Sequence, residues 1–233
     1  MKLNSILILV VSLLIMSCDS KRAKSDLSAE KDTLETSQKQ FAGLPVLFDS
    51  TEVLIHPVGV SESYGSRSFF SSESDYYQHR SSMSHTGSNS IEGTMTNLVF
   101  QHIHSEKMTP LTDQNWKIHS VVFLDEFYRK TGKQLLIYRI SDRDNNQDDK
   151  IDQDDLVSLY SSRLDGTQLI KLTKDDEQLD EYKIIAAMDR LYIRTVSDSD
   201  ENGKFDHRDK FHFYYQELQE ALKPIEYRPF SLD

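Results

Sequence analysis

Apolar residues from Leu44 onward come in short runs separated by polar turns. The runs hold five to eight residues and are rich in valine, isoleucine, leucine, tyrosine and phenylalanine, a composition typical of β-strands. In the last run, Phe211, Phe213 and Tyr215 share one face of the strand while Tyr214 lies on the other. Bulky side chains on both faces predict sheets that are covered on both sides. The predicted strands span residues 53–60, 97–103, 118–123, 134–140, 156–160, 168–172, 182–186, 190–196 and 210–215.

An internal repeat is visible when these runs are aligned. The segment QLLIYRISD (134–142) matches RLYIRTVSD (190–198), and each copy continues through an acidic loop into another strand. An earlier and more divergent copy has residues 52–60 as its first strand and residues 96–112 as its second hairpin. The repeat predicts units of about 55 residues, each with four short strands.

The end of one unit resembles a known kind of repeat. The turn LDGT (164–167), followed by a strand that ends in LT (172–173), is similar to the blade ends of periplasmic Tol-type and related propeller repeats. This resemblance implies an all-β fold of propeller-like repeats, in which antiparallel four-stranded sheets form two clear blades and one degenerate blade. Propellers usually have four or more blades. The sequence therefore leaves open an incomplete propeller or a smaller stack of antiparallel sheets.

The N-terminal residues have the features of an export signal. Lys2 precedes an apolar stretch at 6–15, which as a helix would rise roughly 15 Å, about half the thickness of a bilayer core. The next residues, IMSC (15–18), resemble a bacterial lipobox, and Cys18 is the only cysteine in the chain. The resemblance implies that the signal peptide is residues 1–17 and that a lipid on Cys18 anchors an exported lipoprotein in a membrane of the bacterial cell envelope, facing the periplasm or the cell surface. An ordinary export peptide with an incidental cysteine is the alternative.

Two polar segments interrupt the apolar pattern. Residues 18–42 are rich in serine, lysine and acidic residues and cannot bury enough apolar surface to fold, so they are predicted to form a disordered tether before a domain at 43–233. Within the domain, the serine-rich segment 61–95 is longer than an ordinary loop. It is predicted to be a surface excursion or, through its aromatic residues, a loop that contacts a partner.

Composition excludes several classes of function. A net charge of −11 repels phosphate backbones, so nucleic-acid binding is not expected. One cysteine cannot form an intramolecular disulfide, and there is no Cys/His cluster for structural zinc. His102 and His104 fall on one face of a predicted strand, but a third zinc ligand is not identifiable. No GxSxG, HExxH or glycine-rich phosphate-binding motif occurs.

The strongest chemical signal is the segment DSDENGKFDHRD (198–209). Side-chain oxygens stand at positions 1, 3, 5, 9 and 12 of the segment, and Gly203 at position 6 supplies the positive φ that folds such a loop around a cation. The segment resembles the EF-hand-type calcium loops of dockerins and other exported bacterial proteins that end in aspartate. Phe205 at position 8 is expected to tie the loop to a core. The predicted Ca²⁺ ligands are Asp198, Asp200, Asn202, Lys204 (through its backbone carbonyl), Asp206 and Asp209.

A second copy of this loop is DNNQDDKIDQDD (144–155), which begins 54 residues earlier at the equivalent point of the repeat. Asp149 replaces the glycine at position 6, and because aspartate adopts positive φ at some cost, this site is predicted to be weaker. Asp142 offers a competing register. The predicted Ca²⁺ ligands are Asp144, Asn146, Asp148, Lys150 (through its backbone carbonyl), Asp152 and Asp155.

The segments that flank both loops are strand-like rather than amphipathic helices. Calcium is therefore expected to fix a hairpin and not to open a groove as it does in sensor EF-hands. The sequence predicts a non-enzymatic, calcium-binding envelope lipoprotein that contacts an envelope protein or glycan. The rival prediction is an envelope hydrolase whose carboxylate site the sequence does not identify.

Overall fold

The computed structural model describes residues 39–61, 89–152, 154–220 and 223–230. The predicted signal peptide, Cys18 and most of the predicted tether lie outside these ranges, as do residues 62–88 of the serine-rich segment. The described residues belong to one compact unit. Among them, no helix has the length and apolar character needed to cross a membrane.

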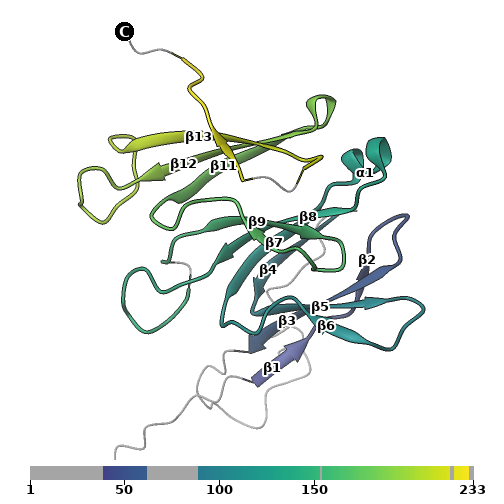
Figure 1. Cartoon of the computed structure of the whole chain (residues 1–233). Coiled ribbons are helices and arrows are strands. Elements are labelled where there is room, and N and C mark those ends of the chain that lie inside the picture. Colours follow the sequence, from purple (N-terminus) through teal and green to yellow (C-terminus); the bar gives the residue numbers. More distant parts are fainter. Residues whose placement is uncertain (1–38, 62–88, 153, 221–222, 231–233) are drawn as a thin grey trace, which may run out of the picture. The chain divides into compact units, whose positions relative to one another are not determined.

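Three antiparallel sheets make up this unit (Figure 1), which confirms the all-β prediction. The N-terminal sheet contains, in order, β1 (Lys39–Ala42), β3 (Val53–Ser61), β5 (Asn97–His102) and β6 (Met108–Pro110), and β2 (Val46–Leu47) also pairs with β3. The central sheet contains β10 (Ile170–Lys171), β9 (Ser158–Arg163), β8 (Leu135–Ser141), β7 (Lys117–Phe123) and β4 (Ser90–Met95). The C-terminal sheet contains β11 (Gln178–Ile185), β12 (Arg190–Ser197), β13 (Lys210–Glu217) and β14 (Ile225–Glu226). None of the three sheets is closed on itself.

Each sheet contains four neighbouring strands in chain order: β1-β3-β5-β6, β7-β8-β9-β10 and β11-β12-β13-β14. The last two sets are meanders of consecutive strands, whereas β2 and β4 come between members of the first set in the chain. The strands that carry the sequence repeat, β8 with β9 and β12 with β13, form the central pairs of their sheets, and β3 with β5 does so in the first sheet. The repeat therefore coincides with the sheets. The N-terminal and central sheets each have one strand more than the predicted four. The additional strands are β2 in the N-terminal sheet and β4 in the central sheet.

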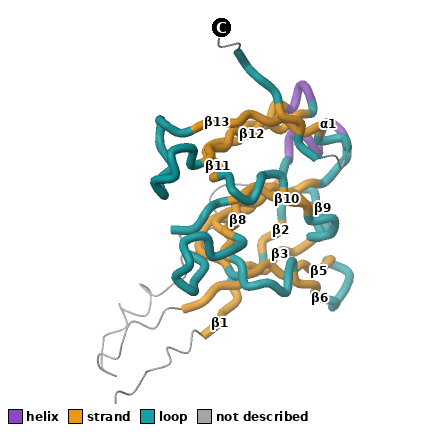
Figure 2. The backbone as a smooth tube through the Cα atoms, turned by 60° about the vertical axis from the view of Figure 1, so that its left-hand side comes forward, coloured by secondary structure: helices purple, strands orange, loops and turns teal. Residues whose placement is uncertain are grey.

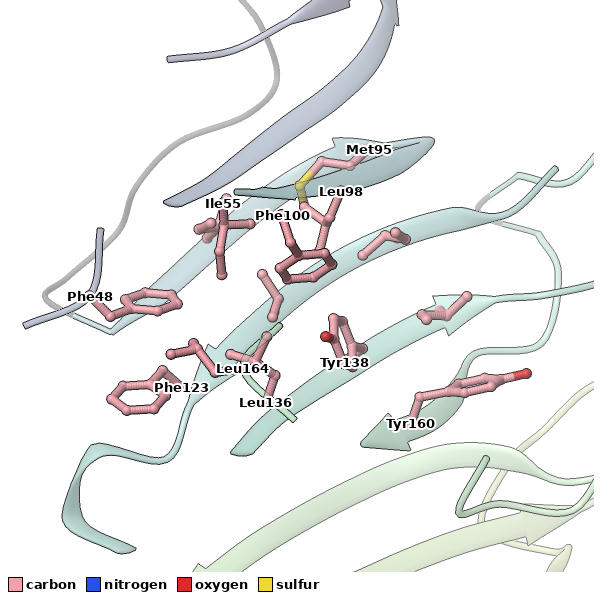
Figure 3. Close-up of a cluster of buried hydrophobic side chains, with 14 residues drawn as sticks. Phe48, Ile55, Met95, Leu98, Phe100, Phe123, Leu136, Tyr138, Tyr160 and Leu164 are labelled. Atoms are coloured by element: carbon pink, nitrogen blue, oxygen red, sulfur yellow. The ribbon is translucent and has the colours of Figure 1, made fainter. Parts of the chain in front are cut away.

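The sheets are stacked so that the central sheet is covered on both faces (Figures 1 and 2). One core lies between the N-terminal and central sheets, where the rings of Phe48 and Phe123 stack 5.4 Å apart (Figure 3). The other core lies between the central and C-terminal sheets. Along β8 the side chains alternate between these cores, since Leu136 and Tyr138 face the first and Ile137 faces the second. The predicted coverage on both sides is thus confirmed for the central sheet.

Two predicted boundaries are wrong, and both errors concern strands without an apolar run. Residues 39–42 were assigned to the tether, but they form β1, which pairs with β3 and places Gln40 opposite Val60. The end of the predicted loop 61–95 forms β4, in which Ile91 and Met95 are buried in the first core. A bulge after Glu92 breaks the alternation along β4. Backbone hydrogen bonding to an existing sheet forms these strands, and the sequence pattern does not reveal it.

The helix α1 (Asp125–Thr131) was not predicted. It connects β7 to β8 and buries one residue, Phe127, in the second core. The helix ends at Gly132, which has a φ of +73° and whose N–H donates to the carbonyl oxygen of Tyr128. A single buried side chain in a helix of seven residues leaves no periodic signal in the sequence.

Substitution of Gly166 tests how tightly the turn after β9 packs, and substitution of Gly132, which has a similar φ, is the control. Both have positive φ, but a Cβ on Gly166 would lie 2.5 Å from Cε2 of the buried Phe100, whereas a Cβ on Gly132 would meet nothing within 4 Å. We expect Gly132→Ala to lower the free energy of unfolding by about 1 to 2 kcal/mol through backbone strain alone. Gly166→Ala should cost about 1 to 3 kcal/mol more, because Phe100 must move. Urea unfolding of both variants measures the difference, and equal losses would contradict the packing of this turn on Phe100.

Candidate metal centre

The two acidic loops occupy corresponding places in neighbouring sheets. Residues 144–155 connect β8 to β9, and residues 198–209 connect β12 to β13. Both loops extend from the same side of the stack (Figures 1 and 2). Each is therefore held at both ends by the two central strands of its sheet.

The loops share one backbone conformation. Positive φ occurs at positions 4 and 6 of each loop: Gln147 (+63°) and Asp149 (+66°) in the first, Glu201 (+55°) and Gly203 (+74°) in the second. Residues with side chains adopt this region at a cost that glycine avoids. The first loop bears that cost at two positions and the second loop at one.

The aspartate at position 1 folds the first half of each loop. In the second loop, Asp198 Oδ1 accepts a hydrogen bond from the N–H of Asn202 (3.1 Å), and its Oδ2 accepts one from the N–H of Gly203 (2.7 Å). In the first loop, Asp144 accepts the same two bonds from the N–H groups of positions 5 and 6, at 3.2 and 2.8 Å. The first carboxylate thereby fixes the turn that contains the positive φ at position 6.

The aspartate at position 12 joins the two ends of each loop. Asp209 Oδ1 accepts from the N–H of Ser199 at position 2 (2.8 Å), and its Oδ2 accepts from the N–H of Asp206 at position 9 (2.9 Å). These two backbone hydrogen bonds, the one from Asp206 first, hold the pKa of Asp209 below its usual value. Asp155 makes the equivalent pair at 2.7 and 2.8 Å. Both carboxylates are buried, with Asp155 4% and Asp209 7% exposed.

Positions 3, 5 and 9 each accept a hydrogen bond from the N–H two residues further on, which is the geometry of an Asx turn. In the second loop these bonds join Asp200 to Asn202 (3.3 Å), Asn202 to Lys204 (2.8 Å) and Asp206 to Arg208 (2.8 Å). In the first loop they join Asn146 to Asp148 (3.1 Å), Asp148 to Lys150 (3.0 Å) and Asp152 to Asp154 (2.9 Å). The side-chain oxygens at every predicted ligand position are therefore held by the loop's own backbone.

Three carboxylates of the second loop converge. Oxygen atoms of Asp198, Asp200 and Asp209 all lie within 4.8 Å of one another, which is close enough to hold one metal ion. Oxygens that accept one N–H keep a second lone pair for a metal. At the position of Asp200 the first loop has Asn146, so an amide there replaces one of the three carboxylates. No other described group of His, Cys, Asp and Glu residues gathers in this way.

Two further expectations can be compared with the structure. Phe205 is 36% exposed and belongs to neither core, so the expectation that it ties the loop to a core is wrong. Asp142, the alternative start of the first loop, lies outside it. Its carboxylate accepts hydrogen bonds from Lys171 Nζ and the Tyr160 hydroxyl, each at 2.7 Å. The first loop therefore has the register that begins at Asp144.

Two serine–histidine contacts, one at the end of each strand that leads into an acidic loop, were not predicted from the sequence. Ser141, the last residue of β8, lies with its Oγ 2.9 Å from Nε2 of His119, and Ser197, the last residue of β12, is 3.0 Å from Nε2 of His212. Burial, with Lys117 nearby, lowers the pKa of His119 to about 4. The sequence does show that both repeat segments end in Ser-Asp. It does not show that a histidine contacts each serine, because the two histidines lie on neighbouring strands.

Comparisons with known proteins assign no family to the chain. No protein-family model matches it, and no curated protein matches it significantly. What the chain binds must be inferred from the chemistry of the two loops.

The unequal cost of positive φ in the two loops gives a reciprocal test at position 6. Asp149→Gly should raise the free energy of unfolding in chelator by about 0.5 to 1 kcal/mol, because the gain in the left-handed region exceeds the added entropy of the unfolded chain. Gly203→Asp should lower it by about 1 kcal/mol. Urea unfolding measures both, and changes of the same sign would contradict the shared loop conformation.

Proposed function

We propose that this protein is a calcium-binding lipoprotein of the bacterial cell envelope, in which calcium stabilises two strand–loop–strand hairpins. One observation supports the proposal most strongly: two loops with the same spacing of oxygen side chains have the same φ pattern and equivalent hydrogen bonds. The convergence of Asp198, Asp200 and Asp209 favours a cation in the second loop. The first loop would bind more weakly.

The donor set favours calcium among common metal ions. All side-chain donors are carboxylate or amide oxygens, whereas zinc sites use histidine and cysteine ligands. Calcium accepts six to eight oxygens in flexible geometry, while magnesium demands a near-ideal octahedron. Because central strands enter and leave each loop, the ion would fix the hairpin and lower the repulsion between carboxylates. Asp198, Asp200, Asn202, Asp206, Asp209 and the carbonyl of Lys204 would hold it in the second loop.

The proposed envelope location rests on the sequence of the N-terminus. An apolar stretch too short to span a bilayer is followed by IMSC, in which Cys18 is the only cysteine of the chain. Lipidation of Cys18 would anchor the protein in a membrane. The first described strand, β1, begins at Lys39, and the residues between Cys18 and β1 would serve as the tether.

We further propose that the three sheets correspond to the blades of a propeller-like fold, and the arrangement of strands supports this. Each sheet contains four antiparallel strands in chain order, although β4 of the central sheet lies between β3 and β5 in the chain, and the sequence repeat falls on the central pairs. Three blades are fewer than a closed propeller usually has. We therefore infer an open, propeller-like stack whose two end sheets each leave one face uncovered by another described sheet.

We also propose that the stack of sheets binds an envelope protein or glycan and does not act as a hydrolase. A hydrolase of the carboxylate type needs acidic groups that converge away from the calcium loops. Asp142 and Asp175 converge in this way, but both carboxylates accept hydrogen bonds from Lys171 Nζ, at 2.7 and 2.8 Å.

Ser197 and His212 do not form a catalytic triad with Glu177. Glu177 approaches Nε2, the nitrogen that also faces Ser197, at 3.9 Å, whereas a triad acid holds the other ring nitrogen. That nitrogen, Nδ1, lies 3.8 Å from Glu226, which is too far for the hydrogen bond of a triad acid.

Calcium binding is tested by titration calorimetry and thermal unfolding of the purified chain with calcium or chelator. At free calcium of about 100 times the dissociation constant, each site should stabilise the folded state by roughly 2.7 kcal/mol. Asp198→Ala should remove more of this gain than Asp144→Ala, because the second loop has the more favourable backbone. Asp113→Ala, at an exposed aspartate outside both loops, is the matched control and should change nothing. Absence of binding heat, with a melting temperature indifferent to calcium, would refute the assignment.

Lipidation is tested separately from calcium binding. The wild-type chain expressed in a Gram-negative bacterium should partition into the detergent phase and carry a lipid mass on its N-terminal cysteine. Cys18→Ser should stay unprocessed by the lipoprotein pathway and lose the lipid, while Ser17→Ala, which keeps a small residue before the cysteine, should be processed normally. A wild-type chain with an unmodified N-terminus in the aqueous phase would contradict the anchor.

A further inference from the structure

A cleft with a volume of about 960 Å³ opens at one side of the stack. Its lining includes the start of β8, the end of β9 and the end of β13, next to the end of α1. The acidic loops join the opposite ends of these strands, so the cleft and the proposed calcium sites lie on opposite sides of the stack (Figure 1). The volume is within the range of pockets that bind small molecules.

The apolar part of the cleft wall is one end of the second core. Its residues belong to that core or pack against it, and they come from the central and C-terminal sheets and from the residues just after β10 and β13: Leu135, Ile170, Leu172, Leu191 and Leu218. Apolar surface is left in water at a cost, and a ligand that covers it with an apolar face of its own removes that cost. The wall therefore favours a ligand that is not polar all round.

The side chain of Gln216 contributes a buried acceptor without a partner. Gln216 follows Tyr214 by two residues on β13, so it lies on the side of the sheet that faces the second core, and it lines the cleft. Its Nε2 donates to the carbonyl oxygens of Glu217 (3.2 Å) and Glu220 (3.0 Å), which sets the orientation of the amide. Its Oε1 accepts no hydrogen bond, although the residue is only 6% exposed. Buried acceptors are rarely left unpaired, so Oε1 indicates a donor from outside the chain.

Two further polar groups of the cleft are available to a ligand. Ser161 lies two residues after Leu159 on β9, which places it on the side of the second core, and its hydroxyl makes no hydrogen bond with another described residue. The side-chain amide of Gln134, just before β8, also has no partner in the described part of the chain. Both side chains are half-buried and line the cleft. Hydroxyl and amide groups can donate and accept, which matches a ligand that carries hydroxyl groups.

The charges that line the cleft cancel. The described lining contains three cationic and three anionic side chains: Lys107, Lys133, Arg163, Asp165, Glu217 and Glu220. This balance differs from the chain as a whole, whose net charge is −11. A strongly charged ligand of either sign would meet like charges in the cleft, so the lining favours a ligand without net charge.

We infer that this cleft is a binding site for a neutral saccharide. A sugar ring carries C–H groups on its face, which fit the wall formed by the second core. Its hydroxyl groups can donate to Gln216 Oε1 and exchange hydrogen bonds with Ser161 and Gln134. The inference rests on the interaction role proposed above, for which it names the ligand, and it is independent of calcium and of the lipid anchor.

The strands around the cleft fit a saccharide better than a peptide. An extended peptide binds most readily by adding a strand to a sheet edge, where main-chain hydrogen bonds hold it. The edge strands that reach the cleft, β6 and β10, have only three and two residues. The hydrogen-bonding groups that remain unpaired are side-chain amides and a hydroxyl, which a saccharide can use without a long strand edge.

An array of neutral oligosaccharides, acidic oligosaccharides and neutral peptides tests the class of ligand. The purified full chain is applied in a detergent without a sugar headgroup, so that the detergent does not compete for the cleft. The expected result is binding to neutral oligosaccharides and not to the other two classes. Binding only to peptides would support a protein partner and overturn the saccharide, as would binding only to acidic oligosaccharides or to nothing. Calorimetric titration of the same protein with calcium tests the metal sites separately.

Two variants test the cleft with an oligosaccharide that the array identifies. Gln216→Met removes the unpaired acceptor with little change in volume and should weaken binding about tenfold. Ser161→Ala removes a hydroxyl that has no partner within the described residues, so the fold should not change, and it should weaken binding about threefold. Ser158→Ala, on the same strand but outside the lining, is the matched control and should bind as the wild type does. Thermal unfolding identifies a misfolded variant. Unchanged affinity in folded Ser161→Ala and Gln216→Met would place the saccharide elsewhere and overturn the site.

Discussion

The central sheet must be covered on both faces, because its strands carry apolar side chains on both sides. Along β8, Leu136 and Tyr138 need one apolar layer and Ile137 needs another. Leaving either face in water would expose side chains worth about 1.5 to 3 kcal/mol each when buried. This requirement brings the N-terminal and C-terminal sheets onto the central one. It also fixes where the acidic loops lie, because β8 and β12 end at the same side of the stack (Figure 1).

The same polar side chains serve two purposes in the acidic loops. The carboxylates at positions 1 and 12 accept backbone hydrogen bonds, so the loop is folded by the groups that are proposed to bind the ion. Such preorganisation costs the apo protein electrostatic repulsion between the carboxylates of Asp198, Asp200 and Asp209. A divalent cation would relieve it. The hairpins would then be most stable with the ion, which matches a structural role at the ends of central strands.

The two outer sheets of the stack differ in the side chains that they carry on their outer sides. The outer side of the C-terminal sheet carries large aromatic side chains held in contact with one another, with arginines balanced by acids. The N-terminal sheet exposes Met108 and Leu47 without comparable aromatic contacts among the described residues. The apolar alternation on β13 was expected to imply a covering layer. Among the described residues, another sheet supplies that layer on one side only.

The sequence by itself determined the strand-rich fold class, the repeat and the spacing of oxygen side chains in both loops, because each depends on the local order of residue types. Runs such as 134–140 and 190–196 match β8 and β12 closely, since a near-continuous apolar run is typical of a strand buried on both faces, as β8 is, and an alternating run of a strand buried on one face, as β12 is. The tertiary structure alone decided the rest. The strands β1 and β4 form because a neighbouring strand offers hydrogen bonds, and the serine–histidine contacts and the aromatic contacts on the outer side of the C-terminal sheet join residues from different strands. Such pairings depend on register and stacking, which a linear pattern does not encode.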